Sequence, residues 1–501
     1  MKSIKQYLVT LPLFLLVMAG ATGCGESFLN VKPKSFVSGS GYFQGSNHIT
    51  ETLNGVYAPL DGLYTGSMWA MAEMRSDNTS YQYNTGDRSG FALEQMDEFR
   101  EIDDNSVVYS MYSTSYNGIA RANALLDNLQ GNTSISDSLN ALVTGQAEFL
   151  RAFYYFNLVR MFGDVPLVLH EVTSTSAAFS DAARQPAKDV YAAIVTDLKA
   201  AVSSLPVRYS QASDLGRVTK GAAETILAKV YMAQHDYDDA IPLLEDVRTL
   251  GYSLLPDYAD IFNPANKNNQ ESIFEVQYKE GTPGSPSNFI YTFAPYNSGS
   301  SIPGFAVYSG SGSGWNIPTA DLINSYEAGD KRKAASISFS FTDPNTGKVV
   351  PYVIKYCHPP YQQQYQTSDD FIVTRYADVL LMLATCLNEK GFVADGEAFQ
   401  LLNQVRHRAG LQDKTASNPV AALRVANQDA FRQAVLAERR VELAFEDHRW
   451  FDLLESGTAT AVMTAHGVEE KKMKSWVLPV SYTQIALTYQ YPRREVQLLT
   501  P

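Results

Sequence analysis

The amino-acid sequence predicts a mainly α-helical protein in which helix pairs are separated by one long irregular region. Residues 107–250 and 374–456 show the apolar spacing of amphipathic helices, with a period near 3.6 residues. Residues 251–370 lose that period and are rich in Gly, Pro, Ser and Asn, so we expect loops with short strands there. One helix pair also has a near copy later in the chain, as in repeat proteins.

The start of the chain has the features of a secretion signal. A short positive segment precedes the apolar run 7–19, which is too short to span a membrane but fits a signal peptide. The string A-T-G-C ending at Cys24 resembles a lipobox, although Ala21 stands where Leu is usual. We expect residues 1–23 to be removed and residues 24–501 to form one body anchored by a lipid on Cys24. A plain secretion signal followed by an incidental cysteine is the alternative.

The helices before the irregular region are predicted from their apolar stripes. Residues 49–63 and 107–129 each carry one stripe. The stretch 147–169 carries two, so its helix is expected to be buried on nearly all sides until Gly163 ends it. Three further helices are predicted at residues 189–205, 218–234 and 239–250.

The repeated string is A-x-x-L-L-x-x-V-R, which occurs at residues 240–248 and again at residues 398–406. Small residues let paired helices approach closely, and a helix–turn–helix of roughly 34 residues with Ala at its contacts is the tetratricopeptide pattern. We therefore predict tetratricopeptide-like pairs that are interrupted by insertions. They lie near residues 107–163, 187–250, 374–409 and 428–456.

Several strings, in order along the chain, resemble signatures of the SusD/RagB family of outer-membrane nutrient-binding lipoproteins. The clearest is R-A-x-x-Y-F-x-L-V-R-x-F-G-D-V-P-L at residues 151–167. A second is E-R-R-x-E-L-x-F-E-x-x-R-W-x-D-L at residues 438–453. The others are the start at Cys24, R-Y-A-D-V-L-L at 375–381, N-x-V-R-x-R-A-G-L at 403–411 and W-V-L-P-V at 476–480. The terminal Asn-Pro-Gly-Tyr of the family is missing.

This resemblance implies a SusD-like fold in which loops near residues 64–100 and 251–370 bind the ligand. It also implies a cell-surface lipoprotein of the outer membrane that captures oligosaccharide and delivers it to a SusC-like TonB-dependent transporter. A peptide ligand, as in RagB-like uptake proteins, is the first alternative. A surface glycoside hydrolase and a structural scaffold that binds partner proteins in its helical grooves are the others.

Aromatic side chains on these loops are the physical candidates for sugar binding. Sugar rings stack their C–H faces on aromatic planes, while amides, carboxylates and Arg bond the hydroxyls. By position in the loops, the expected ligand-binding residues are Trp69, Arg75, Asp77, Asn78, Tyr81, Tyr83, Tyr296, Asn297, Tyr308 and Trp315. For any single aromatic residue among these, packing in the core is the alternative.

The sequence offers no catalytic or metal-binding motif. It lacks His-Glu-x-x-His, Cys-x-x-Cys and phosphate-loop strings, and its seven His are scattered. Glu438, Glu442 and Glu446 are four apart, which suits paired catalytic carboxylates but is more typical of a salt-bridge network on a helix. We therefore expect no enzyme activity and no cofactor. The net charge of -13 opposes nucleic-acid binding.

The sequence leaves three points open. It does not identify the glycan or peptide, it does not decide whether Cys357 and Cys386 form a disulfide, and it does not decide whether a structural metal ion is bound.

Overall fold

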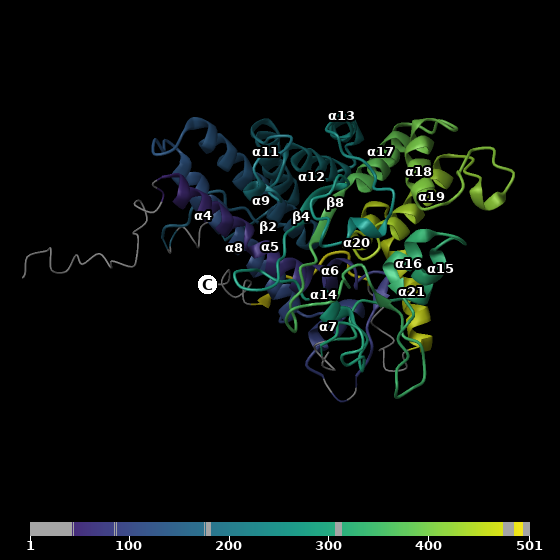
Figure 1. The fold of residues 1–501 in the computed structure, drawn as a ribbon. Helices are drawn as coiled ribbons and strands as arrows, with labels where there is room; N and C mark the ends of the chain where they lie inside the picture. Colours follow the sequence, from purple (N-terminus) through teal and green to yellow (C-terminus); the bar gives the residue numbers. More distant parts are fainter. Residues whose placement is uncertain are drawn as a thin grey trace, which may run out of the picture.

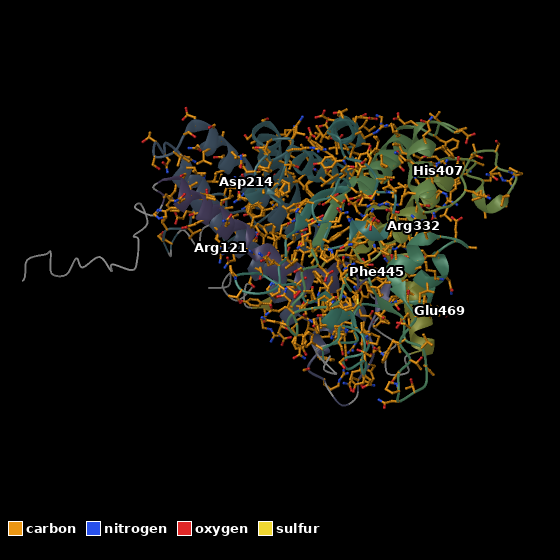
Figure 2. All side chains as sticks on the ribbon, viewed as in Figure 1. Arg121, Asp214, Arg332, His407, Phe445 and Glu469 are labelled. Carbon is orange, nitrogen blue, oxygen red and sulfur yellow. The ribbon has the colours of Figure 1, made fainter. Side chains whose placement is uncertain are left out.

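The structure is a computed structural model that describes residues 43, 45–84, 86, 88–174, 176, 182–305, 313–473 and 485–493. Helices make up most of it, and the strands form only two-stranded sheets in the described part (Figure 1). The prediction of a mainly α-helical protein is confirmed. Side chains fill the space between the elements, with Phe445 and Arg332 among those labelled in Figure 2. No helix of the described residues is long and apolar enough to cross a membrane.

The long helices form a row in which each packs against its neighbour in the chain. The row begins with α4 (Ser46–Tyr57), α8 (Ser106–Leu129), α9 (Asp137–Phe162), α11 (Ala187–Ser204) and α12 (Lys220–Ala233). It continues across the irregular region with α13 (Tyr237–Thr249), α17 (Tyr376–Lys390), α18 (Glu397–Arg408) and α19 (Gln428–Glu442). In Figure 1 the helices α11, α12, α13, α17 and α18 follow one another along the upper edge. The helix pairs predicted near residues 107–163, 187–250 and 374–409 are therefore confirmed. In the pair predicted near 428–456, α20 (Arg449–Glu455) follows α19 but does not pack against it as the others do. The assignment as tetratricopeptide units stays a prediction.

Helix α9 is the buried centre of the first half of this row. The Ser136 hydroxyl caps its start by accepting a hydrogen bond of 3.3 Å from the Leu139 N–H. Gly163 ends it with a φ of 74°, a conformation that glycine adopts without strain. From Gly145 onward nearly every side chain of α9 is buried, because α8 and α11 pack against it. The two apolar stripes in the sequence predicted this burial correctly.

Short antiparallel strand pairs tie the irregular region to the helices. Strand β4 (Ser272–Val276) pairs with β8 (Phe371–Arg375), so that Val276 lies opposite Phe371. Strand β1 (Thr79–Ser80) pairs with β5 (Ile317–Pro318). The remaining pairs are β2 (Val165–Pro166) with β3 (Arg184–Gln185), and β6 (Ile337–Ser338) with β7 (Tyr352–Val353). The short strands predicted within residues 251–370 are thus present, as β4, β5, β6 and β7.

Residues 64–72 differ from the prediction, because they are helical and largely buried rather than an exposed loop. They belong to a π-helix, η1 (Leu63–Met68), and to α6 (Trp69–Ala72). Apolar residues of these turns enter the same core as α8. The loops of this region that reach the surface begin only after β1.

Candidate functional site

Two loops that are far apart in the sequence are joined by hydrogen bonds below the helical row. One follows β1, and the other leads from α14 (Phe289–Phe293) to β5. The Gln82 N–H donates to the Gly314 carbonyl at 2.7 Å, and the Gly314 N–H donates to the Ala294 carbonyl at 2.7 Å. The Tyr296 N–H donates to Gln82 Oε1, also at 2.7 Å. Residues from both loops are therefore held in one place.

The centre of this place is Trp315, which is buried rather than exposed. Its ring covers Gly90 so closely that a Cβ atom at that position would lie 2.2 Å from Trp315 Cζ2. The Tyr81 ring lies 5.8 Å from it between centroids, and the Tyr81 hydroxyl donates to Glu98 Oε1 at 2.6 Å. The prediction that Tyr81 and Trp315 face the ligand is therefore wrong, because both rings support the site from within.

Exposed rings and polar groups surround this buried centre. The Arg88 guanidinium lies 4.6 Å from the centre of the Tyr83 ring and 5.8 Å from that of Phe91. Phe91 begins α7 (Phe91–Asp97) and is 42% exposed. Tyr296 and Asn297 are partly exposed on the second loop. We call the set the aromatic loop cluster, and it consists of Gln82, Tyr83, Arg88, Phe91, Tyr296 and Asn297.

Phe91 and Arg88 were not predicted. The sequence did contain a signal for Phe91. A large apolar residue stands directly after Gly90, at the start of a helix that has no apolar stripe to bury it. Arg88 donates to Glu94 Oε1 at 2.6 Å, so its guanidinium is fixed above the two rings rather than free in solution. Tyr308, another predicted ligand residue, lies outside the described residues.

Two other residues expected to bind ligand lie in the interior. Trp69 is buried against Phe293, with 5.4 Å between ring centroids. Arg75 is fully buried between the rings of Phe99 and Tyr489, at 4.1 and 4.2 Å from their centroids. The predictions for these two residues are wrong, because folding removes them from solvent.

Asp77 and Asn78 are likewise buried, and their polar atoms have partners within the chain. Arg449 Nε donates to Asp77 Oδ1 at 2.7 Å. Arg440 Nε donates to Asn78 Oδ1 at 2.9 Å, and Asn78 Nδ2 donates to Glu73 Oε1 at 2.9 Å. Burial opposes the ionisation of Asp77, but the hydrogen bonds from Arg449 together with the charges of Arg449 and Arg440 outweigh burial and lower its pKa. The ligand role predicted for this pair is therefore also wrong.

The three glutamates spaced four apart belong to a buried ion-pair network. Glu442 Oε1 lies 2.6 Å from Arg375 Nη1, and Glu442 Oε2 lies 2.9 Å from Arg332 Nη1. Glu438 pairs with Arg332 at 2.6 Å, and Glu446 pairs with Arg375 at 2.8 Å. The salt-bridge interpretation is confirmed, with partners on other segments instead of the same helix. A general acid needs a raised pKa, whereas the charges of Arg408, Arg375 and Arg332 hold the pKa of Glu442 below its usual range against the effect of burial.

The described part of the chain contains no activated cysteine and no cluster of metal-ligating side chains. Cys357 and Cys386 are free thiols and do not form a disulfide. Burial raises the pKa of Cys357 to about 11, whereas a nucleophilic thiol needs a lowered pKa. Among the described residues, no group of three or more His, Cys, Asp or Glu side chains is placed to hold a metal ion.

Comparison with known proteins agrees with this architecture. Residues 342–477 match the model of the SusD family, and residues 27–232 match one described as starch-binding associating with outer membrane. SusD-like protein P25 of Formosa agariphila is 27% identical, covering 94% of each chain. SusD-like protein P2 of the same organism is 28% identical, covering 93% of each.

Solved structures share the fold. A laminarin binding SusD-like protein superposes with a TM-score of 0.73 and 25% identity, covering 91% of this chain and 98% of that one. Surface glycan-binding protein A from Bacteroides thetaiotaomicron, in complex with laminarihexaose, gives a TM-score of 0.71 at 20% identity with the same coverage. The two family models lie at opposite ends of one continuous fold, and the relatives extend over nearly all of it. The chain is therefore a member of the SusD-like family.

Proposed function

We propose that this protein binds oligosaccharide at the cell surface and delivers it to a SusC-like TonB-dependent transporter, without catalysing a reaction. Family membership supports a role in nutrient capture. The solved relatives named for laminarin binding and crystallised with laminarihexaose support a glycan rather than a peptide as the ligand class. Delivery to a transporter is proposed from family membership alone.

The observation that carries the proposal is the aromatic loop cluster. Phe91 is exposed and Tyr83 and Tyr296 are partly exposed, while Arg88, Gln82 and Asn297 supply donors and acceptors beside them. A sugar ring needs this pairing of an apolar plane with polar groups at its edge. Hydrogen bonds between the two loops and the buried Trp315 hold the cluster in place, so little ordering entropy is lost on binding.

Affinity electrophoresis through gels containing single polysaccharides tests the proposal. We expect the wild-type protein to be retarded by at least one neutral glycan, and Tyr83→Ala and Tyr296→Ala to weaken that retardation at least tenfold. A tenfold loss corresponds to about 1.4 kcal/mol. The matched control is Phe339→Ala, which removes an exposed aromatic ring (45%) from the segment that joins β6 and β7. Equal retardation of all three variants would contradict the assignment of the site.

Peptide-binding and reducing-sugar assays on the same variants separate the alternatives. Retardation by no glycan, together with binding of unfolded peptide that the tyrosine variants lose, favours the RagB-like alternative. Release of reducing sugar that disappears with a single Asp or Glu substitution favours the hydrolase. The buried ion pairs of Glu438, Glu442 and Glu446 argue against these residues as its catalytic carboxylates.

The position at the membrane is proposed from the start of the chain. SusD-like proteins are associated with the outer membrane, and we propose that this one is anchored by a lipid on Cys24. Residues 1–42 lie outside the described part. Cys24→Ala should leave the protein in the soluble fraction of the cell, whereas Cys357→Ala should not. Co-purification of a TonB-dependent transporter with the wild-type protein tests the partner.

A further inference from the structure

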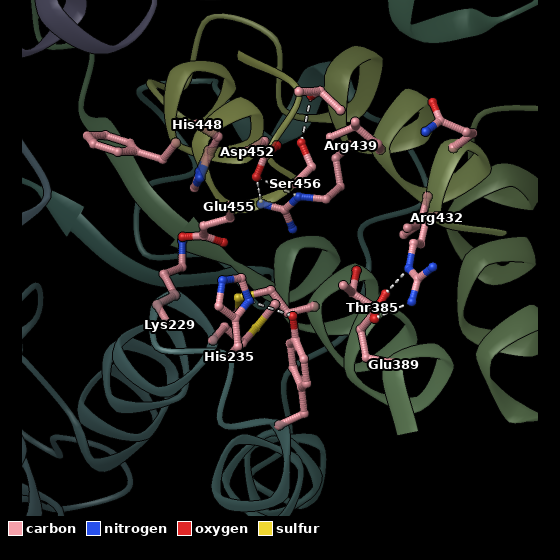
Figure 3. A pocket seen from close by; sticks show the side chains of 18 of the residues that line it. Lys229, His235, Thr385, Glu389, Arg432, Arg439, His448, Asp452, Glu455 and Ser456 are labelled. Carbon is pink, nitrogen blue, oxygen red and sulfur yellow. Dashed lines mark hydrogen bonds and ion pairs between the residues drawn. The ribbon is translucent and has the colours of Figure 1, made fainter. Parts of the chain in front are cut away.

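A cavity of about 430 Å³ lies within the helical row, apart from the aromatic loop cluster (Figure 3). Its walls come from α12, α13, α17, α19 and α20 (Arg449–Glu455), and Arg160 of α9 also reaches it. The cavity and the aromatic loop cluster have no residue in common. Nothing in the proposed function uses this cavity, which we call the helical pocket.

Most charged groups of the helical pocket are paired with one another. Arg432 binds Glu389 through two hydrogen bonds of 2.6 and 2.7 Å. Arg439 Nε donates to Asp452 Oδ1 at 2.9 Å. Asp378, behind the wall, accepts from Arg439 at 2.7 Å and lies 2.6 Å from Lys229. The cations are Arg160, Lys229, Arg432 and Arg439, and the carboxylates are Glu389, Asp452, Glu455 and Asp378. Lys229, Arg432 and Arg439 thus already have carboxylate partners, whereas Arg160 and Glu455 have none in the described part of the chain.

Three groups at the pocket keep unused hydrogen-bonding capacity. Glu455 has no hydrogen bond or ion pair with any described residue. Arg160 donates to Asn157 Oδ1 at 2.5 Å, but its Nε atom is buried without a partner among the described residues. His448 is only 9% exposed, and its Nε2 atom is also buried without a partner there. Buried polar groups without partners cost free energy, so a ligand that bonds them binds favourably.

The protonation states of these groups define what such a ligand must offer. Burial raises the pKa of Glu455 to about 7, and burial together with Lys229 holds the pKa of His448 well below its usual range. His448 is therefore neutral, with one donor and one acceptor nitrogen. The Arg160 guanidinium is fixed between the rings of Phe156 and Phe451, at 4.1 and 3.7 Å from their centroids, and is a donor only.

Hydroxyl groups satisfy all three partners at once, because a hydroxyl both donates and accepts. Because most charged groups of the pocket already have partners inside it, a net charge on the ligand would find little compensation in a half-enclosed space. Apolar side chains that suit the C–H face of a ring also line the pocket, namely Met232, Met382, Leu436 and Phe451. The volume lies within the range of small-molecule sites.

We propose that the helical pocket binds an uncharged, polyhydroxylated molecule of monosaccharide size, at a site separate from the aromatic loop cluster. The proposal rests on the proposed function only in taking this molecule to be a carbohydrate. Glu455, Arg160 and His448 bond its hydroxyls. Long glycan chains bind at the loops, whereas this pocket takes a single sugar unit.

Saturation-transfer NMR on the mature chain with Tyr83→Ala and Tyr296→Ala, which remove the loop site, tests the proposal. The probes are D-glucose, D-galactose, D-mannose and D-xylose, with D-glucuronate and D-glucosamine as charged relatives. We expect millimolar binding of at least one neutral sugar and at least tenfold weaker binding of its charged relatives. Glu455→Gln and Leu436→Trp, which fills the pocket, should each reduce the signal at least tenfold. Glu51→Gln on the exposed face of α4 is the matched control.

Each outcome decides between the alternatives. Absence of neutral-sugar binding, preference for a charged probe, or binding unaffected by both pocket substitutions overturns the proposal. Glu455→Gln keeps the size of the side chain, so it remains informative if Leu436→Trp fails to fold. Polysaccharide retardation tests the loop site separately, because the pocket substitutions should leave it unchanged in a chain with intact loops. Loss of retardation with retained monosaccharide binding would refute only the proposed function.

Discussion

Arg375 Nη1 lies 2.6 Å from Glu442 Oε1, and both side chains are fully buried. Arg375 ends β8 and directly precedes α17, whereas Glu442 ends α19. The pair therefore joins the strand pair of the irregular region to the last long helix of the row. Arg332 and Glu271 extend it, at 2.9 Å from Glu442 and 2.7 Å from Arg375. Because every charge here has left water, the fold depends on each partner being present.

Glu442→Gln should therefore lower the free energy of unfolding by about 3–5 kcal/mol, since it leaves buried arginines without their counter-charge. Denaturation by urea, followed by circular dichroism, measures this change. The matched control is Glu397→Gln, which removes a half-exposed carboxylate paired with Arg248 at 2.8 Å. An exposed pair contributes roughly 0–1 kcal/mol. Similar losses of the free energy of unfolding in the two variants would show that burial does not increase the contribution of an ion pair to stability.

The stability difference between wild type and Glu442→Gln should also depend on pH. Burial favours the neutral carboxyl, but Arg408, Arg375 and Arg332 outweigh it and hold the pKa of Glu442 below its usual value of 4.5. A carboxyl with a lowered folded pKa stabilises the fold above the unfolded pKa and loses that effect as the pH falls. We expect the difference to be constant at neutral pH and to shrink below about pH 4.5. A difference that grows on acidification would contradict this.

The pKa of Asp447 is raised, in contrast to that of Glu442. Both of its carboxylate oxygens are buried without a partner among the described residues, and burial, with repulsion from Glu73 and Glu446, raises its pKa well above the usual 3.8. The folded chain then holds a proton that the unfolded chain releases above pH 3.8, so stability falls as the pH rises. Asp447→Asn keeps the shape and tolerates the φ of 61° at this position. We expect a higher melting temperature than wild type at about pH 8 and no gain near pH 3.5, measured by calorimetry.

The sequence predicted local patterns well and long-range pairing poorly. The stripes of α9 and the stop at Gly163 are local, and the structure confirms both. Residues 75–78 have the composition of an exposed loop, so their burial was missed. Asp77 finds its partner Arg449 at a distance of 372 residues along the chain, which no local pattern reveals. Phe91 was missed for the converse reason, because an exposed aromatic residue leaves no periodic signal.

The burial of Trp69 leads to a prediction that distinguishes a core residue from a ligand-binding residue by their effects on stability and on glycan affinity. Its ring packs edge-on against Phe293 and is almost fully buried. Trp69→Ala should lower the free energy of unfolding by about 3–5 kcal/mol, as for other large core residues, while the folded fraction keeps its affinity for glycan. Tyr296→Ala should do the reverse, with little change in stability and a loss of affinity. Denaturation curves and affinity gels of both variants, run at a temperature where each is folded, measure the two effects.

The close packing of α8 on α9 depends on a single glycine. A Cβ atom at Gly118 would lie 2.3 Å from Tyr154 Cε2. The Tyr154 ring is fully buried, and its hydroxyl donates to the Val56 carbonyl at 2.7 Å, so the ring cannot move without breaking that bond. Gly118→Ala should therefore lower the free energy of unfolding by about 1–3 kcal/mol despite the better helix propensity of alanine.

Gly55 on α4 is the matched control, because it is also helical and a Cβ atom added there would meet no neighbouring segment within 4 Å. There the entropic advantage of alanine acts alone, so Gly55→Ala should raise the free energy of unfolding by about 0.4–1 kcal/mol. Urea denaturation of both variants measures the two signs. If Gly118→Ala instead raised the free energy of unfolding, α8 and α9 could move apart without losing stability. The close packing of α8 on α9 would then not be essential to the helical row.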